Sequence, residues 1–177
     1  MSVDWPAEII EQLEWHWTTQ LRPRLDGLTD EEYVWAPTPD AWMIHPDAAP
    51  DARIDWAYPP PDPAPVTTIA WRIAHIVVGC FGARSASHFG AAPVDYDSFP
   101  YARTAAGALA QLDSGYATWL AGVRGWASAG TMAQPLGPGE GHFAAYPRGT
   151  LVLHINREVI HHGAEIALLR DLWAHRG

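Results

Sequence analysis

Four stretches of the chain carry apolar side chains at intervals of three and four residues, which is the spacing of an amphipathic α-helix. They span residues 4–25, 68–88, 104–128 and 150–174, and the first shows the stripe Ile9, Leu13, Trp17 and Leu21. No convincing strand pattern emerges between them. We therefore predict an all-α fold, a four-helix bundle with long connecting loops, in a single domain over residues 1–177.

Residues with known preferences for helix ends support these limits. Asp4 is placed to cap the first helix, Thr67 or Thr68 the second and Thr150 the last, and the sequence Thr29-Asp-Glu-Glu is typical of a capping box that opens a short helix. Pro23 is expected to end or kink the first helix near its last turn.

The connection over residues 37–65 holds 9 of the 16 prolines, and a loop of this length in a compact domain is usually functional or disordered. Because Trp42, Trp56 and Tyr58 lie in it, we expect it to pack over the bundle. It is long enough to serve as a crossover between parallel helices or to carry a lid. A second loop, over residues 130–149, is rich in glycine and proline.

Composition excludes several classes of function. The net charge is −9, and all 11 basic residues are arginines, so a nucleic-acid partner and docking on anionic membranes are not expected. Cys80 is the single cysteine, which excludes a disulfide framework and a cysteine-rich zinc site. The sequence shows neither an apolar run long enough to span a membrane nor a signal pattern at its start, so a cytoplasmic protein is expected.

The last helix carries polar residues inside its apolar stripe. On a helical wheel with Glu158 at zero, the stripe is centred at about +30° to +50° and His162 falls at about +40°. A buried carboxylate must be paired, protonated or bound to a metal. Glu158 and His162, one turn apart, therefore form either a buried hydrogen-bonded pair or two ligands of one metal ion.

His154 and His161 lie on the border of the same stripe. Each could support a metal ligand through a hydrogen bond, act as a general base or serve as a fourth ligand. Their border positions favour a location at the rim of a pocket or on the protein surface. Cys80 is expected to be a buried structural thiol rather than a nucleophile.

His75 is the one ionisable residue near the centre of the second helix, which is apolar around nearly its whole circumference. Gly79 and Gly82 follow on the same side and suggest open volume beside the imidazole. Considered without the last helix, this pattern favours a core histidine whose ring nitrogens are hydrogen-bonded within the protein. If it faces Glu158 and His162 across a bundle, the three make a ligand set with an open position, as in catalytic zinc sites.

Three segments carry a family resemblance: TTIAWRIAHIVVG, LHINREVIHHGAE with LLRDL after it, and LDGLTDEEYVWAP behind the first helix. Together they resemble the DinB/YfiT-like superfamily of small metal-binding helical bundles. The resemblance implies an up-down-down-up bundle and a divalent ion, usually zinc or nickel, held by His75, Glu158 and His162. Many members have histidine at the position of Glu158. The glutamate resembles the branch of mycothiol-dependent maleylpyruvate isomerase and related thiol transferases.

The function expected from this resemblance is enzymatic: a metal-dependent S-transferase or isomerase that uses a low-molecular-weight thiol such as mycothiol on a small-molecule substrate. Three alternatives stay open, namely a metal-dependent hydrolase, a non-catalytic metal- or ligand-binding bundle, and a bundle that has lost its metal. The tryptophan-rich surface is also compatible with a homodimer.

Overall fold

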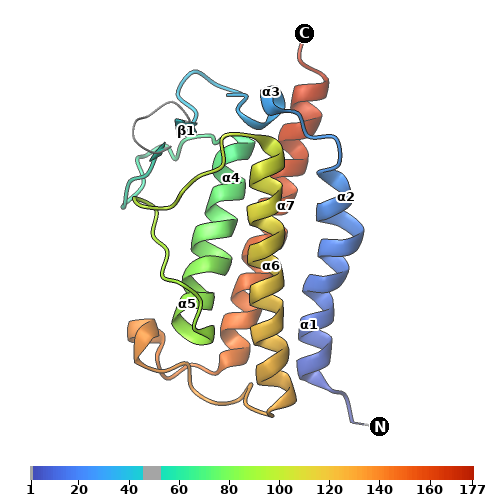
Figure 1. Ribbon diagram of the computed structural model, residues 1–177, viewed down its shortest axis with the longest axis vertical. Coiled ribbons are helices and arrows are strands. Elements are labelled where there is room, and N and C mark those ends of the chain that lie inside the picture. Colours follow the sequence, from blue (N-terminus) through green and yellow to red (C-terminus); the bar gives the residue numbers. More distant parts are fainter. Residues whose placement is uncertain (1, 46–52) are drawn as a thin grey trace.

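The structure is a computed structural model that describes residues 2–45 and 53–177. Four long helical units pack side by side (Figure 1). In the first, α1 (Trp5–His16) continues through a π-helical turn, Trp17–Leu21, into α2 (Arg22–Arg24). In the second, α4 (Ile69–His75) continues through a π-helical segment, Ile76–Gly82, into α5 (Ala83–Phe89). The third and fourth are α6 (Ala105–Ser128) and α7 (Arg148–Ala174). The predicted all-α bundle is confirmed.

The helices follow the up-down-down-up order (Figure 1). The chain ascends in α1, descends in α4–α5, descends again in α6 and ascends in α7. The crossover between the parallel helices α5 and α6 is the segment 90–104, which climbs the length of the bundle. Of the two roles considered for residues 37–65, that of the crossover is wrong, because those residues follow the short helix α3 (Asp30–Tyr33) and join antiparallel helices at one end of the bundle.

Side-chain caps fix most helix starts as expected. The Asp4 carboxylate accepts from the Ala7 N–H, and the Thr68 hydroxyl accepts from the Trp71 N–H. The last helix begins earlier than predicted, at Arg148, so Thr150 lies in its first turn rather than at its cap. Pro147 supplies the extended residue before the helix, and the next two N–H groups donate to carbonyls of the preceding loop.

The connection over residues 37–65 packs against the bundle through its tryptophans. The Trp42 N–H donates to the Val66 carbonyl, and the Trp42 carbonyl accepts from Thr68 at the start of α4. Trp56 stacks on Tyr96 with ring centroids 4.2 Å apart. Tyr58 is the exception, because it is 88% exposed. A short antiparallel pair, β1 (Ile44–His45) and β2 (Arg53–Ile54), supports this segment, and residues 46–52 lie outside the described part.

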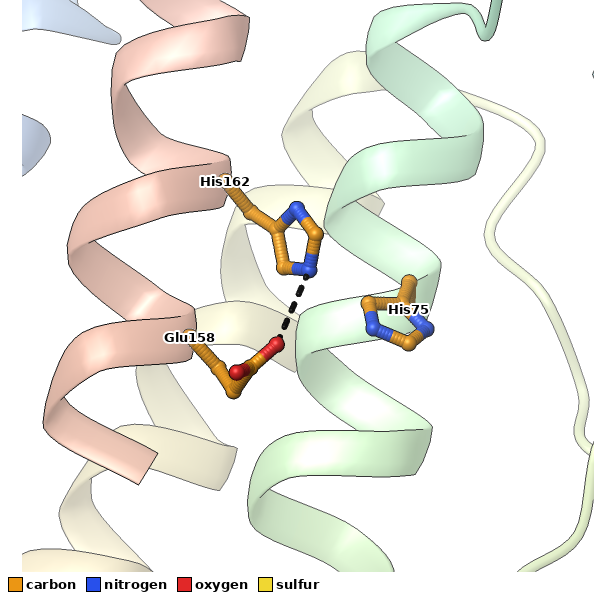
Figure 2. A group of neighbouring side chains, drawn as sticks. All are labelled: His75, Glu158 and His162. Atoms are coloured by element: carbon orange, nitrogen blue, oxygen red, sulfur yellow. Dashed lines mark ion pairs between the residues drawn. The ribbon is translucent and has the colours of Figure 1, made fainter. Parts of the chain in front are cut away.

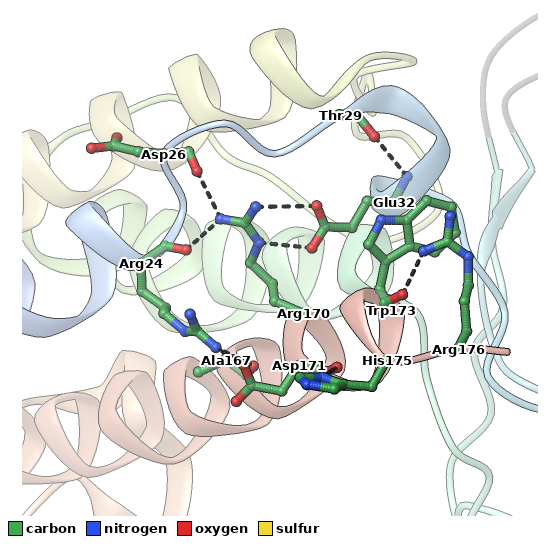
Figure 3. A network of polar contacts seen from close by, with 10 residues as sticks. All are labelled: Arg24, Asp26, Thr29, Glu32, Ala167, Arg170, Asp171, Trp173, His175 and Arg176. Carbon is green, nitrogen blue, oxygen red and sulfur yellow. Dashed lines mark hydrogen bonds and ion pairs between the residues drawn. The ribbon is translucent and has the colours of Figure 1, made fainter.

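Arg170, near the end of α7, ties the top of the bundle together (Figure 3). Its guanidinium makes two hydrogen bonds, of 2.7 and 3.1 Å, to the carboxylate of Glu32 on α3. It also donates to the carbonyls of Arg24 and Asp26 in the turn after α2. Because the Glu32 side chain is 4% exposed, this is a buried ion pair that fixes α3 and the start of the long connection.

Within the described residues, no helix has both the length and the apolarity needed to cross a membrane.

Candidate metal centre

His75, Glu158 and His162 meet between α4 and α7 (Figure 2). One donor atom of each lies within 4.8 Å of the donors of the other two. His162 Nε2 is 3.6 Å from Glu158 Oε2, and the two imidazole rings stand nearly perpendicular with centroids 4.7 Å apart. The structure therefore brings together the three residues that the sequence selected. Whether they hold a metal stays a prediction at this point.

His75 is the last residue of α4, directly before the π-helical segment. A Cβ at Gly79 would overlap the Tyr96 hydroxyl, and one at Gly82 would lie 2.7 Å from Val94 Cγ2. The expectation of open volume beside the imidazole is thus wrong, because the crossover 90–104 fills it. The glycines instead let the crossover approach α4 closely enough for Tyr96 to reach His75.

The Nδ1 atom of each histidine makes a hydrogen bond to a residue outside the group of three. His75 Nδ1 lies 2.7 Å from the Tyr96 hydroxyl, and His162 Nδ1 lies 2.7 Å from Glu165 Oε2. Glu165 is in turn paired with Arg72, with Nε and Oε2 3.0 Å apart. Metal-binding histidines typically donate one ring N–H to a carboxylate or another acceptor, which fixes the ring and directs the other nitrogen to the ion. The contacts at Nδ1 leave Nε2 of both rings for an ion.

Burial keeps both imidazoles in the form that binds metals. It lowers the pKa of His75 to about 4, and the nearby His162 and Arg72 add to the effect. Burial also lowers the pKa of His162, although the hydrogen bond that its ring donates to Glu165 acts in the opposite direction. Both shifts favour the neutral ring, which is the form that binds a metal. Glu158 supplies the third donor from a half-buried carboxylate, with 28% of its side chain exposed.

Aromatic side chains cover one side of His75. The ring of Trp71 stacks on the imidazole with centroids 5.3 Å apart and an interplanar angle of 10°. Trp56, from the long connection, lies over Trp71 and Tyr96. These rings shield the imidazole from water on this side.

The other candidate residues lie outside the centre or at its edge. His154 Nδ1 is 3.5 Å from Glu158 Oε1, but 41% of its side chain is exposed. His161 is 64% exposed and lies 3.4 Å from Glu165. With His162 and Glu165 it forms a second group of potential ligands, in which the carboxylate is already paired with Arg72.

Cys80 is buried, as predicted. Its burial, together with the negative charge of Glu158, raises the pKa of the thiol to about 12. Burial and the raised pKa both favour the protonated thiol and a structural role.

The contacts of Tyr96, Glu165 and Arg72 were not predicted from the sequence. Glu165 lies one turn after His162, and Arg72 lies three residues before His75. That helical spacing was a signal that could have found both. Tyr96 lies in an irregular crossover, where no periodicity points to it.

A comparison with protein-family models matches residues 12–166 to the DinB superfamily. The match includes all three candidate ligands, together with Tyr96 and Glu165. Neither the curated proteins nor the solved structures gave a match to the chain.

Proposed function

The chain belongs to the DinB superfamily, and we propose that it is a metal-dependent enzyme in which His75, Glu158 and His162 hold a divalent ion that activates a low-molecular-weight thiol. The observation that carries the proposal is the convergence of these three donors, with both imidazoles oriented through Nδ1 and uncharged. The reaction we assign is S-transfer or thiol-assisted isomerisation of a small molecule, with mycothiol as the expected type of thiol.

The donor set fits a zinc or nickel ion. Two neutral imidazoles and one carboxylate are common ligands of both metals, and three protein ligands leave a position for water or substrate. A structural zinc site, by contrast, is closed by four protein ligands. The half-buried position of Glu158 is also consistent with access from outside.

The bound ion would act as a Lewis acid that lowers the pKa of a coordinated thiol. The protein's own groups prepare the site for this chemistry. Glu158 contributes one negative charge, Tyr96 and Glu165 hold the imidazole rings in place, and the rings of Trp71 and Trp56 keep water from one side.

The attacking sulfur must come from an added thiol, because Cys80 is buried and protonated. In a transfer, a bond forms between that sulfur and an electrophilic carbon, and the leaving group departs with its electron pair. In an isomerisation the same bond forms and later breaks, so the thiol is regenerated. The thiol proton passes to solvent when the thiolate forms. In the isomerisation the electron pair of the broken bond returns to sulfur, which then takes up a proton from solvent again.

The first test is metal analysis of the protein purified without a histidine tag. We expect about one equivalent of a divalent metal in the wild type and a strong loss in His75→Ala. Less than about a tenth of an equivalent after incubation with zinc or nickel, together with equal uptake by His75→Ala, would contradict metal binding at this centre.

The second test addresses the thiol. Cys80 is the single cysteine of the chain, so the variant Cys80→Ala contains no thiol. In this variant loaded with Co²⁺, a thiolate bound to the metal must come from the added compound. Adding mycothiol, glutathione or cysteine should produce a near-ultraviolet sulfur-to-cobalt absorption band. Conjugation of monochlorobimane with the same thiol should accelerate. Bound metal without a band or acceleration for any thiol would exclude thiol activation and leave a hydrolase or a binding module.

A further inference from the structure

A cavity of about 470 Å³ lies at the lower end of the bundle, between α5, the first turns of α7 and the helical turn η3 (Pro138–Phe143). In Figure 1 this turn is the orange segment beside the end of α5. Such a volume suits a small organic ligand. His154 lines the cavity, and its Nδ1 lies 3.5 Å from Glu158 Oε1, so the cavity ends one helical turn from the candidate metal centre.

Most of the wall is apolar. Leu151 and Leu153 contribute from α7, and the rings of Phe143 and Tyr146 contribute from the loop. These two rings meet edge to face with centroids 5.7 Å apart, and each is about half exposed. Aromatic rings that are accessible at the edge of an apolar cavity favour a ligand with a ring or a short hydrocarbon chain.

The charged groups of the wall do not balance. Glu140 is buried with 4% of its side chain exposed, and its two oxygens lie 2.7 Å from Arg84 and 2.9 Å from His88. Its charge is therefore compensated by Arg84. Arg157 is left as a second cation, 70% exposed, with its guanidinium 2.6 Å from His154 Nδ1.

Arg84 also keeps an unused donor. Its Nε is buried and has no hydrogen-bond partner within residues 2–45 and 53–177, while its Nη1 holds Glu140. The Nε atom is enclosed by protein, but the Arg84 side chain is 32% exposed and lines the cavity, so its other N–H groups can reach an acceptor on a ligand. Arg157 lies 3.6 Å from Glu158, and a cation held by Glu158 would leave the Arg157 charge free to attract an anion.

We propose that this cavity binds an apolar molecule of single-ring size with one carboxylate, and that it is the substrate site of the metal centre. The carboxylate pairs with Arg84 and Arg157, and the hydrocarbon part lies against Leu151, Phe143 and Tyr146. The assignment as substrate site and the pairing with Arg157 rest on the proposed function, because Arg157 lies beside Glu158 until a cation occupies that carboxylate. The pairing of the carboxylate with Arg84 does not rest on it.

Calorimetric titration with 4-phenylbutyrate and its uncharged amide tests the proposal. The key variant is Arg84→Gln combined with Glu140→Gln, which removes the ion pair without leaving a buried charge alone. We expect the carboxylate to bind wild type more tightly than the amide does, and the double variant to lose about tenfold or more of its affinity for the carboxylate alone. Arg103→Gln, which removes an exposed arginine far from the cavity wall, should bind like wild type.

Equal affinities for acid and amide, or an unchanged affinity in the double variant, would overturn the proposal. If circular dichroism shows that the double variant is unfolded, Thr150→Trp replaces it, because this exposed residue lines the cavity and a tryptophan there would occupy it. Thr150→Trp should then abolish binding of both probes, and normal binding would refute the site.

The same titrations on chelator-treated and zinc-loaded protein separate this proposal from the proposed function. Binding that persists without metal and depends on Arg84 supports the cavity even if metal analysis fails. Binding that requires metal and is unchanged in the double variant would mean that the carboxylate coordinates the ion. That result would contradict the cavity site but would still support the metal centre.

Discussion

Glu165 lies behind His162, and its replacement measures how much the surrounding contacts contribute to metal affinity. Its Oε2 is 2.7 Å from His162 Nδ1 and 3.0 Å from Arg72 Nε, so one oxygen orients the imidazole and balances the guanidinium. Loss of such a partner typically weakens metal binding about 10- to 100-fold, which corresponds to about 1.4 to 2.7 kcal/mol.

We expect two substitutions of Glu165 to fall at opposite ends of this range of affinity loss. Glu165→Gln keeps an oxygen that can accept from His162, so we expect a loss of about tenfold. Glu165→Ala leaves the imidazole N–H without its acceptor and Arg72 without its counter-charge, so we expect a loss of up to about 100-fold. The side chain of Glu165 is 31% exposed, and water that replaces it keeps the loss from exceeding this range.

The assay is competition for zinc against a chromophoric chelator at pH 7.5, with thermal unfolding of each metal-free variant to verify the fold. Glu11→Gln is the matched control, because it removes one negative charge from an exposed position on α1. The reasoning is refuted if Glu165→Ala binds zinc as tightly as wild type. It is also refuted if Glu11→Gln weakens binding equally, since the effect would then come from net charge.

Three further predictions follow from the same contacts. Folding lowers the pKa of His75 to about 4. In the metal-free protein the neutral ring therefore contributes its full share of the stability above pH 6.5, and this contribution is lost as the pH falls towards 4. The free energy of unfolding in urea should depend less on pH over this range in His75→Gln than in wild type. Gly79→Ala should displace the Tyr96 hydroxyl from His75 and lower zinc affinity in the competition assay without loss of fold. Arg170→Ala should cost about 3–5 kcal/mol in denaturant unfolding, because Glu32 stays buried without its partner, and a further Glu32→Gln change should restore part of that loss.

The convergence of the three candidate ligands could be predicted from the sequence because they lie on helices. Glu158 and His162 are one turn apart within an apolar stripe, and His75 is the ionisable residue at the centre of an apolar helix. Helical periodicity places such residues on a face without knowledge of the tertiary structure. The bundle itself was predictable for the same reason, since four long apolar stripes must be buried against one another.

The connections could not be predicted in the same way, because their paths depend on which helix ends are neighbours. Residues 37–65 have the length of a crossover, but the crossover is the shorter segment 90–104. Tyr96 reaches His75 only because this segment runs along α4, where Gly79 lets it approach. Length and composition distinguish neither the path of a loop nor the contact that one of its side chains makes.

The candidate centre and its surroundings therefore come from two kinds of structure, helices and loops, which differ in how readily they accept amino-acid substitutions. The candidate ligands and Glu165 lie on α4 and α7, where the packing of the helices fixes their spacing. Tyr96 and Trp56, by contrast, come from irregular segments, as does the wall of the lower cavity around Phe143. Loops accept sequence change more readily than packed helices. Substitutions in residues 90–104 and 130–147 should thus alter which molecule reaches the centre while leaving its three donors in place.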